Sequence, residues 1–101
     1  MAFTPEEEIE FLKQLCKEAQ KQVECTIVLV ARHKELFDVL TVYLENDNEE
    51  RYEVAELRYL HDDNRGHLIE ICWYPAGSSM FQQTSMFYAC PWLLAAILKA
   101  S

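Results

Sequence analysis

The sequence predicts an α+β domain: an N-terminal helix, an antiparallel meander of four or five strands and a C-terminal helix, with the helices packed on one face of the sheet. Three observations lead to this fold class. A capped amphipathic segment opens the chain, β-branched and aromatic runs separated by turn sequences fill its middle, and a proline-initiated apolar run closes it. The 101 residues, half of them hydrophobic and 26% charged, correspond to one folded domain, which we expect to span residues 1–101.

The first helix is predicted from its start signal. Thr4 is a good N-cap, Pro5 suits the first helical position, and Glu7 can complete a capping box. The apolar residues that follow recur at three- and four-residue spacing, so one side of the helix should pack on a sheet. They are Ile9, Leu12, Cys16, Ala19 and Val23, with Phe11 and Leu15 widening the stripe.

Four strands are predicted over residues 25–31, 36–44, 51–60 and 67–74, each rich in strand-forming residues and joined to the next by a short polar turn. The third strand has a break in its alternation. Tyr52 and Val54 share one face, whereas Leu57 and Tyr59 fall on the other, so a β-bulge is expected near residues 55 and 56.

The end of the chain is less regular. Residues 80–88 fit a fifth strand or an early helix, and the strand is favoured. Residues 91–99 begin with proline and predict a terminal helix. Because this helix has almost no polar face, we expect it to be buried on nearly all sides.

The second strand is apolar on both faces, although a small sheet needs only one such face for its core. Leu36, Leu40, Val42 and Leu44 share one parity and are the expected core side. The other parity, extended to the matching face of the fourth strand, mixes apolar and hydroxyl-bearing side chains, which suits an interface. The predicted partner-binding residues are Phe37, Val39, Thr41, Tyr43, Leu68, Cys72 and Tyr74.

The net charge of −8 is concentrated in one segment. Eight acids lie there against Arg51 and Arg58, a local balance of 2 − 8 = −6, and we expect one end of the molecule to carry most of the negative potential. They are Glu45, Asp47, Glu49, Glu50, Glu53, Glu56, Asp62 and Asp63. This charge disfavours direct nucleic-acid binding, which requires basic residues, and permits a basic protein partner; solubility is the simpler explanation.

No local motif predicts catalysis, a metal site or a cofactor. His61 and His67 flank a turn that contains two aspartates, but they lack a second pair of ligands at metal-binding spacing. Cys72 or Cys90 could pair with a histidine only through tertiary contacts that the sequence does not indicate. We expect no enzyme activity.

The location of the protein is predicted from what the sequence lacks. The first six residues do not resemble a secretory signal, and the longest apolar run, residues 91–98, is much shorter than the ~20 residues of a membrane-spanning helix. The four cysteines form no C-x-x-C pair and are expected to be reduced. We therefore expect a cytoplasmic protein without a membrane partner.

These observations favour a small acidic, non-catalytic protein-binding module of the adaptor, chaperone, immunity or inhibitor type, acting as a homodimer. Two alternatives stay open. One is a small-ligand-binding module or minor enzyme with a pocket between the sheet and the helices. The other is an acidic nucleic-acid mimic that blocks a DNA- or RNA-binding protein through the acidic segment.

Overall fold

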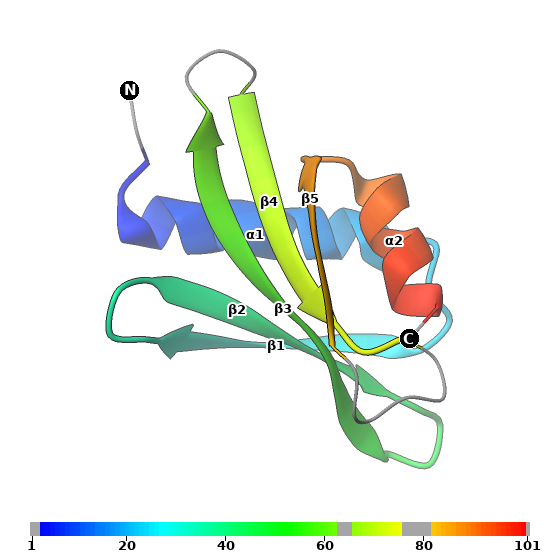
Figure 1. The fold of residues 1–101 in the computed structure, drawn as a ribbon. Helices are drawn as coiled ribbons and strands as arrows, with labels where there is room; N and C mark the ends of the chain where they lie inside the picture. The colour runs from blue at the N-terminus through cyan, green and yellow to red at the C-terminus, as the bar shows by residue number, and fades with distance from the viewer. Residues whose placement is uncertain (1–2, 63–65, 76–81, 101) are drawn as a thin grey trace.

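The computed structural model describes residues 3–62, 66–75 and 82–100 and confirms the predicted fold class (Figure 1). The elements in chain order are α1 (Pro5–Gln20), β1 (Thr26–His33), β2 (Asp38–Glu45), β3 (Arg51–Asp62), β4 (Gly66–Trp73), β5 (Gln83–Tyr88) and α2 (Pro91–Lys99). The segment over residues 80–88 is therefore a strand from Gln83 onward, and residues 80 and 81 lie outside the described ranges.

The five strands form one antiparallel sheet in the order β1-β2-β3-β4-β5, so each strand pairs with the next one along the chain. The sheet is strongly twisted: β1 and β2 run across the long rising strands β3 and β4 (Figure 1). α1 crosses behind the sheet, and α2 stands beside β5. Neither α1 nor α2 lies over the face that points away from α1, and we call it the open face.

The start of α1 forms the predicted capping box. The Glu7 N–H donates to Thr4 Oγ1 at 3.2 Å, and the Thr4 N–H donates to Glu7 Oε1 at 2.9 Å. Both groups are otherwise left without partners at a helix start, so the box fixes where α1 begins. The predicted apolar stripe is buried at Ile9, Leu12, Leu15, Cys16, Ala19 and Val23.

The core lies between the sheet and the two helices. Leu40, Leu57 and Ile71 form one row across β2, β3 and β4, and all three are fully buried. Three residues of α2 reach the same core, namely Leu94, Ala95 and Leu98.

A bulge in β3 resolves the phase break of this strand. Val42 pairs with Ala55, but the next residue, Tyr43, pairs with Glu53, so Val54 is the extra residue. Val54 and Ala55 are consequently both buried on the core side, although they are adjacent in sequence. The bulge predicted near residues 55 and 56 is present and begins one residue earlier.

Two predictions about burial are wrong. Leu36 was expected in the core but is 89% exposed, because β2 begins only at Asp38 and Leu36 lies in a turn that the Lys34 N–H closes on the Phe37 carbonyl at 2.9 Å. The terminal helix was expected to be buried on nearly all sides, yet Trp92 is 72% exposed and Leu93 is 50% exposed. Among the described residues, α2 lies at one side of the domain and packs on α1 and the core, which leaves Trp92 and Leu93 exposed on its other side.

Leu36 and Leu40 form a matched pair for testing the position of the core. Replacing Leu40 with Ala should lower the free energy of unfolding by about 2–5 kcal/mol, since it removes buried methyl groups and leaves a cavity. Leu36→Ala should change it by less than about 0.5 kcal/mol. Urea unfolding measures both, and equal effects would contradict this assignment of the core face.

Candidate protein-binding surface

The predicted partner-binding residues lie on the open face, but they do not form one apolar patch. Thr41 of β2 and Cys72 of β4 are both in register with Glu56 of β3, which stands between them. On the same side of β3, Arg58 is in register with Glu70. A charged row on β3 therefore separates the two halves of the predicted set, which are Phe37, Val39, Thr41 and Tyr43 on one side and Leu68, Cys72 and Tyr74 on the other.

The β2 half of this set is covered by long side chains from its own face. Thr41 is fully buried although no helix covers it. Arg32 lies over it: its Nε donates to Thr41 Oγ1 at 3.1 Å, and its Nη2 donates to the Tyr43 hydroxyl at 2.7 Å. Val39, which is in register with Arg32, is also buried.

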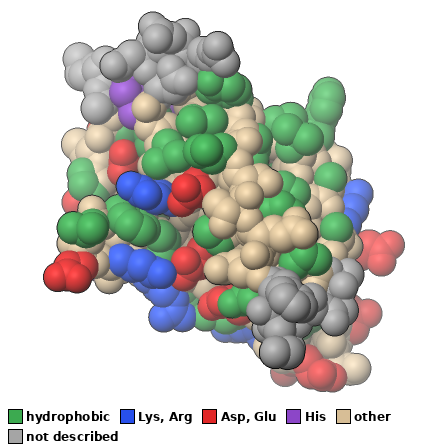
Figure 2. Space-filling view, viewed as in Figure 1, with side chains coloured by type: hydrophobic (Ala, Val, Ile, Leu, Met, Phe, Trp, Pro, Cys, Tyr) green, Lys and Arg blue, Asp and Glu red, His purple; other side chains and the backbone are tan. Residues whose placement is uncertain are grey.

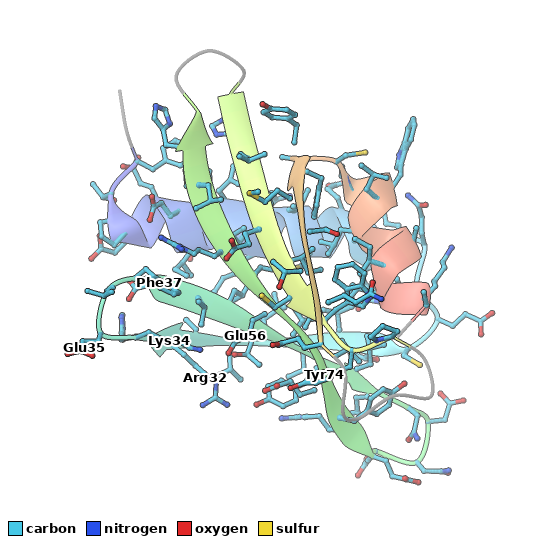
Figure 3. The ribbon with its side chains drawn as sticks, viewed as in Figure 1. Arg32, Lys34, Glu35, Phe37, Glu56 and Tyr74 are labelled. Atoms are coloured by element: carbon cyan, nitrogen blue, oxygen red, sulfur yellow. The ribbon has the colours of Figure 1, made fainter. Side chains whose placement is uncertain are left out.

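Two further contacts extend this cover. Lys34 Nζ lies 3.2 Å from Glu56 Oε2, and the Arg58 guanidinium lies over the Phe37 ring, 3.9 Å from its centroid. Figure 3 shows Arg32, Lys34, Phe37 and Glu56 gathered near the β1–β2 hairpin, with Tyr74 farther toward the other end of β3. Amphipathic side chains thus do here what a second helix layer would otherwise do.

The charge on Arg32 has an unusual environment for so acidic a protein. Its two hydrogen-bond partners are neutral hydroxyl groups, and we find no carboxylate within ion-pair distance of it among the described residues. The guanidinium is held in a fixed orientation while its charge is not neutralised by a neighbour. Such a group can bind a carboxylate of another molecule.

The acidic segment does not form a single end of the molecule. Glu45 pairs with Arg51 at the start of β3, whereas Asp62 is the last residue of this strand, so the eight acids do not all lie at one end of the molecule. Glu56 lies mid-strand and pairs with Lys34. The side chain of Asp62 and all of Asp63 fall outside the described part.

The acids near the β2–β3 turn do lie together. Asp47, Glu49 and Glu50 are exposed in the turn, and Glu45 pairs with Arg51 at 3.0 Å. We call Glu45, Asp47, Glu49, Glu50 and Glu53 the acidic end. The opposite end of β2 carries Arg32, Lys34 and Arg58, with Glu56 paired to Lys34 and Glu70 in register with Arg58, so the open face is more acidic at the turn end of β2 than at the Arg32 end.

The exposed apolar residues near the end of the chain were not predicted from the sequence. Met86 of β5 is 62% exposed, and Tyr88 is partly exposed on the same side of that strand. Trp92 and Leu93 follow on the first turn of α2. In Figure 2, hydrophobic side chains flank the Lys, Arg, Asp and Glu side chains of the open face. The apolar run 91–98 was the available signal, but a run of this kind does not distinguish burial from exposure.

The histidine predicted at the β3–β4 turn takes part in an aromatic cluster. The Tyr59 hydroxyl and His67 Nδ1 are 2.6 Å apart, and the Phe3 and Phe11 rings lie 5.2 and 4.4 Å from the His67 ring. Burial, and secondarily the charge of Glu8, raises the pKa of Tyr59. The hydroxyl therefore keeps its proton at neutral pH, and its hydrogen bond with His67 closes this end of the core.

The cysteines occupy different environments. Cys72 Sγ lies 3.3 Å from Thr84 Oγ1 on the open face, and Cys90 is the N-cap residue of α2. Burial raises the pKa of the Cys16 thiol to about 12, so this thiol is protonated at neutral pH and is a poor nucleophile. Within residues 3–62, 66–75 and 82–100, no three His, Cys, Asp or Glu side chains are grouped as a metal site would require.

One groove between the helices and the sheet corresponds to the ligand-binding alternative. It has a volume of about 330 Å³ and lies where the end of α1, β2, β3 and α2 meet. Its lining includes the apolar residues Val23, Leu44 and Leu98 together with Tyr52 and Lys99. A small amphipathic molecule could bind there.

Comparisons with protein-family models, with curated proteins and with solved structures found no match to this chain. Among the described residues, neither helix is long and apolar enough to span a membrane. The functional argument therefore depends on the surfaces described above.

The buried thiol of Cys16 should make stability depend on alkaline pH. In the unfolded chain a thiol ionises near pH ~8.5, whereas in the folded protein Cys16 keeps its proton up to about pH 12. The folded state then binds the proton more tightly, so the free energy of unfolding should fall as pH rises through this window. In urea titrations, Cys16→Ala should show a shallower fall than the unmodified protein, and Cys72→Ala should not. Equal slopes in all three proteins would contradict the assignment.

Proposed function

We propose that this chain is a small acidic, non-catalytic protein-binding module of the adaptor, chaperone, immunity or inhibitor type, which works in the cytoplasm as a homodimer. The observation that carries the proposal is the oriented charge of Arg32 on a sheet face that neither α1 nor α2 covers. Arginine and aromatic residues are the side chains most enriched among those that dominate binding energy at protein interfaces.

The composition of the open face supports protein binding. Beside Arg32 lie Phe37, Tyr43 and Arg58, whose rings and guanidinium groups are held by contacts within the same face. Side chains that are already ordered lose little further entropy when a partner binds. The face therefore offers an oriented charge and aromatic surface without first having to rearrange.

A second copy of the chain is complementary to this face. If two open faces pack with their β2 strands antiparallel, the Arg32 end of one copy meets the acidic end of the other, and the reverse contact follows from the two-fold symmetry. The parallel arrangement would instead bring like charges together. Charge polarity thus favours one of the two orientations.

The dimer can be tested through Tyr43, whose hydroxyl accepts from Arg32. Tyr43→Lys should dissociate the dimer, because it removes this acceptor and places a second positive charge beside the guanidinium. The fold should be retained, since Tyr43 is only half-buried. Light scattering at tens-of-micromolar concentration gives the mass, and circular dichroism monitors folding. Tyr52→Lys, a partly exposed tyrosine on the helix side, is the matched control and should leave the dimer intact.

A monomeric mass for the unmodified protein would eliminate the homodimer and leave only a different protein as partner. Unfolding of Tyr43→Lys would mean that the cover over Thr41 belongs to the core. In that case Arg32→Gln provides the second test, because it removes the charge without inserting one, and retention of the dimer would contradict the proposed interface.

The acidic end provides an independent test of orientation. Replacing Glu50 and Glu53 together with Gln should raise the dissociation constant of the dimer severalfold and flatten its salt dependence, because the opposing Arg32 loses its counter-charges. The control variant, Glu10→Gln with Glu24→Gln, changes the net charge by the same amount but on other parts of the surface. Sedimentation equilibrium at low and high salt compares the variants. Equal effects from both pairs would show that only net charge matters, and complete loss of partner binding in the first pair would favour the nucleic-acid mimic.

A further inference from the structure

The first strand of the sheet has an outer edge that is only partly paired. β1 pairs with β2 on one side and is the last strand of the sheet. At its beginning, the side-chain amide of Gln20 takes the place of a neighbouring strand. Gln20 Oε1 accepts from the Ile27 N–H at 2.7 Å, and Gln20 Nε2 donates to the Cys25 carbonyl at 2.9 Å.

These contacts determine which backbone groups point outward. In an antiparallel pair, alternate residues exchange hydrogen bonds with the neighbouring strand and the others point away from it. The Ile27 N–H points to Gln20, so the odd-numbered residues of β1 face the outer edge. The Lys34 N–H bonds to the Phe37 carbonyl and agrees with this alternation. The N–H and C=O groups of Leu29 and Ala31 therefore lie on the outer edge, beyond the reach of Gln20.

A groove runs beside this edge, between β1 and α1. It has a volume of about 220 Å³ and is lined by Lys13, Cys16, Lys17, Gln20, Ile27 and Leu29. Its base is apolar, and two of the protein's nine basic residues stand on its helix wall. Lys13 lies 3.7 Å from Glu10, in an exposed pair of little energetic weight, and no ion pair is found for Lys17 among the described residues.

We propose that the β1 edge and this groove bind an extended acidic segment of a partner protein, which adds to the sheet as a sixth strand. Its backbone bonds to Leu29 and Ala31, an apolar side chain enters the groove over Cys16 and Ile27, and its carboxylates contact Lys13 and Lys17. Strand addition of this type gains affinity from main-chain hydrogen bonds and specificity from the side-chain pocket. The inference extends the proposed protein-binding function to a second surface and does not depend on the open-face dimer.

Charge decides between this occupant and a second copy of β1. The strand, Thr26–His33, contains no acidic residue and carries Arg32 near its end. A second β1 would bring no counter-charge to Lys13 or Lys17. An acidic segment supplies it, so the groove fits a partner other than the chain itself.

The probe for this site is a phage-displayed library of random linear peptides, selected on the full chain. Recovered peptides should carry an apolar residue with Asp or Glu two residues away, because alternate residues of an added strand share the face that points into the groove. In the presence of such a peptide, hydrogen exchange followed by NMR should show new protection of the Leu29 and Ala31 amides, while the Val28 and Val30 amides, which face β2, are protected with or without it.

Substitutions then test each part of the site. Ala31→Pro removes an outward N–H from an exposed position of an edge strand, where proline is tolerated, and should abolish peptide binding while the chain stays folded. If Ala31→Pro unfolds, the hydrogen-exchange data on the unmodified chain decide whether the peptide binds at this edge. Ala31→Val keeps the backbone N–H and should still bind the peptide. Lys13→Glu with Lys17→Glu should weaken peptide binding, measured by fluorescence anisotropy, by about tenfold or more. Lys21→Glu, on the same helix outside the groove, is the control and should have little effect.

Three results would overturn the inference. The first is a selection that yields no peptide with protection at Leu29 and Ala31, and the second is a peptide that binds folded Ala31→Pro as well as the unmodified chain. The third is protection of these two amides that rises with protein concentration in the absence of peptide, which would assign the edge to a second copy. The Tyr43→Lys variant should bind the peptide normally, so failure of the open-face dimer and failure of this site are distinguishable.

Discussion

The single extra residue in β3 determines which side chains this protein shows to its surroundings. Val54 is inserted between residues that pair with Tyr43 and Val42, so the strand changes phase at that point. Beyond the bulge, Leu57 and Tyr59 enter the core. Without the change of phase, the alternation set by Tyr52 and Val54 would direct Glu56 and Arg58 into the core, where unpaired charges are strongly destabilising. The bulge therefore creates the core and the charged row of the open face together.

That charged row helps to explain how Thr41 is buried on the open face, which neither helix covers. The Lys34–Glu56 contact is partly exposed, with 45% and 26% of the two side chains accessible, and ion pairs of this kind contribute little by themselves. The cover is held mainly by the packing of long side chains on Val39 and Thr41 and by the two hydroxyl contacts of Arg32. Because this cover consists of ordered surface side chains and not of a packed helix, a partner can contact it without unfolding any part of the domain.

Sequence patterns predicted the fold well where the signals are local. The capping box at Thr4, the stripe of α1 and the phase break of β3 are each encoded within a few residues, and each was found. The errors concern tertiary position. Leu36 follows the alternation of β2 but precedes the strand, and Trp92 belongs to an apolar helix that has neighbours on one side only. Periodicity describes which residues share a face, and it does not tell whether anything covers that face.

The same limit applies to the candidate site. The alternation of side chains along β2 and β4 identified their open-face residues. It did not show that β3 lies between these two strands, so the charged residues Glu56 and Arg58 of β3 were not included in the predicted surface. The acids from Glu45 to Asp63 were grouped because they are close in sequence, whereas the long strand β3 separates Asp62, its last residue, from Arg51, its first residue, which pairs with Glu45 of β2. The Gln20 contacts to β1 could not be predicted, because they join the end of a helix to a strand edge through a side chain that has no distinctive spacing.

The basic residues gain significance from the acidic background in which they lie. A net charge of −8 repels acidic molecules at long range, so an acidic partner is bound only where a local arrangement of cations outweighs this repulsion. Arg32 with Lys34 and Arg58 on the open face, and Lys13 with Lys17 beside β1, are two such arrangements on different sides of the sheet. On the open face the charge is held rigidly by hydroxyl groups, which favours a partner with one matching geometry. Beside β1 the lysines are exposed and the backbone edge supplies the geometry, which favours an extended segment whose exact side chains can vary. If both proposals hold, the two surfaces combine a site of fixed geometry with an adaptable one in a single small sheet.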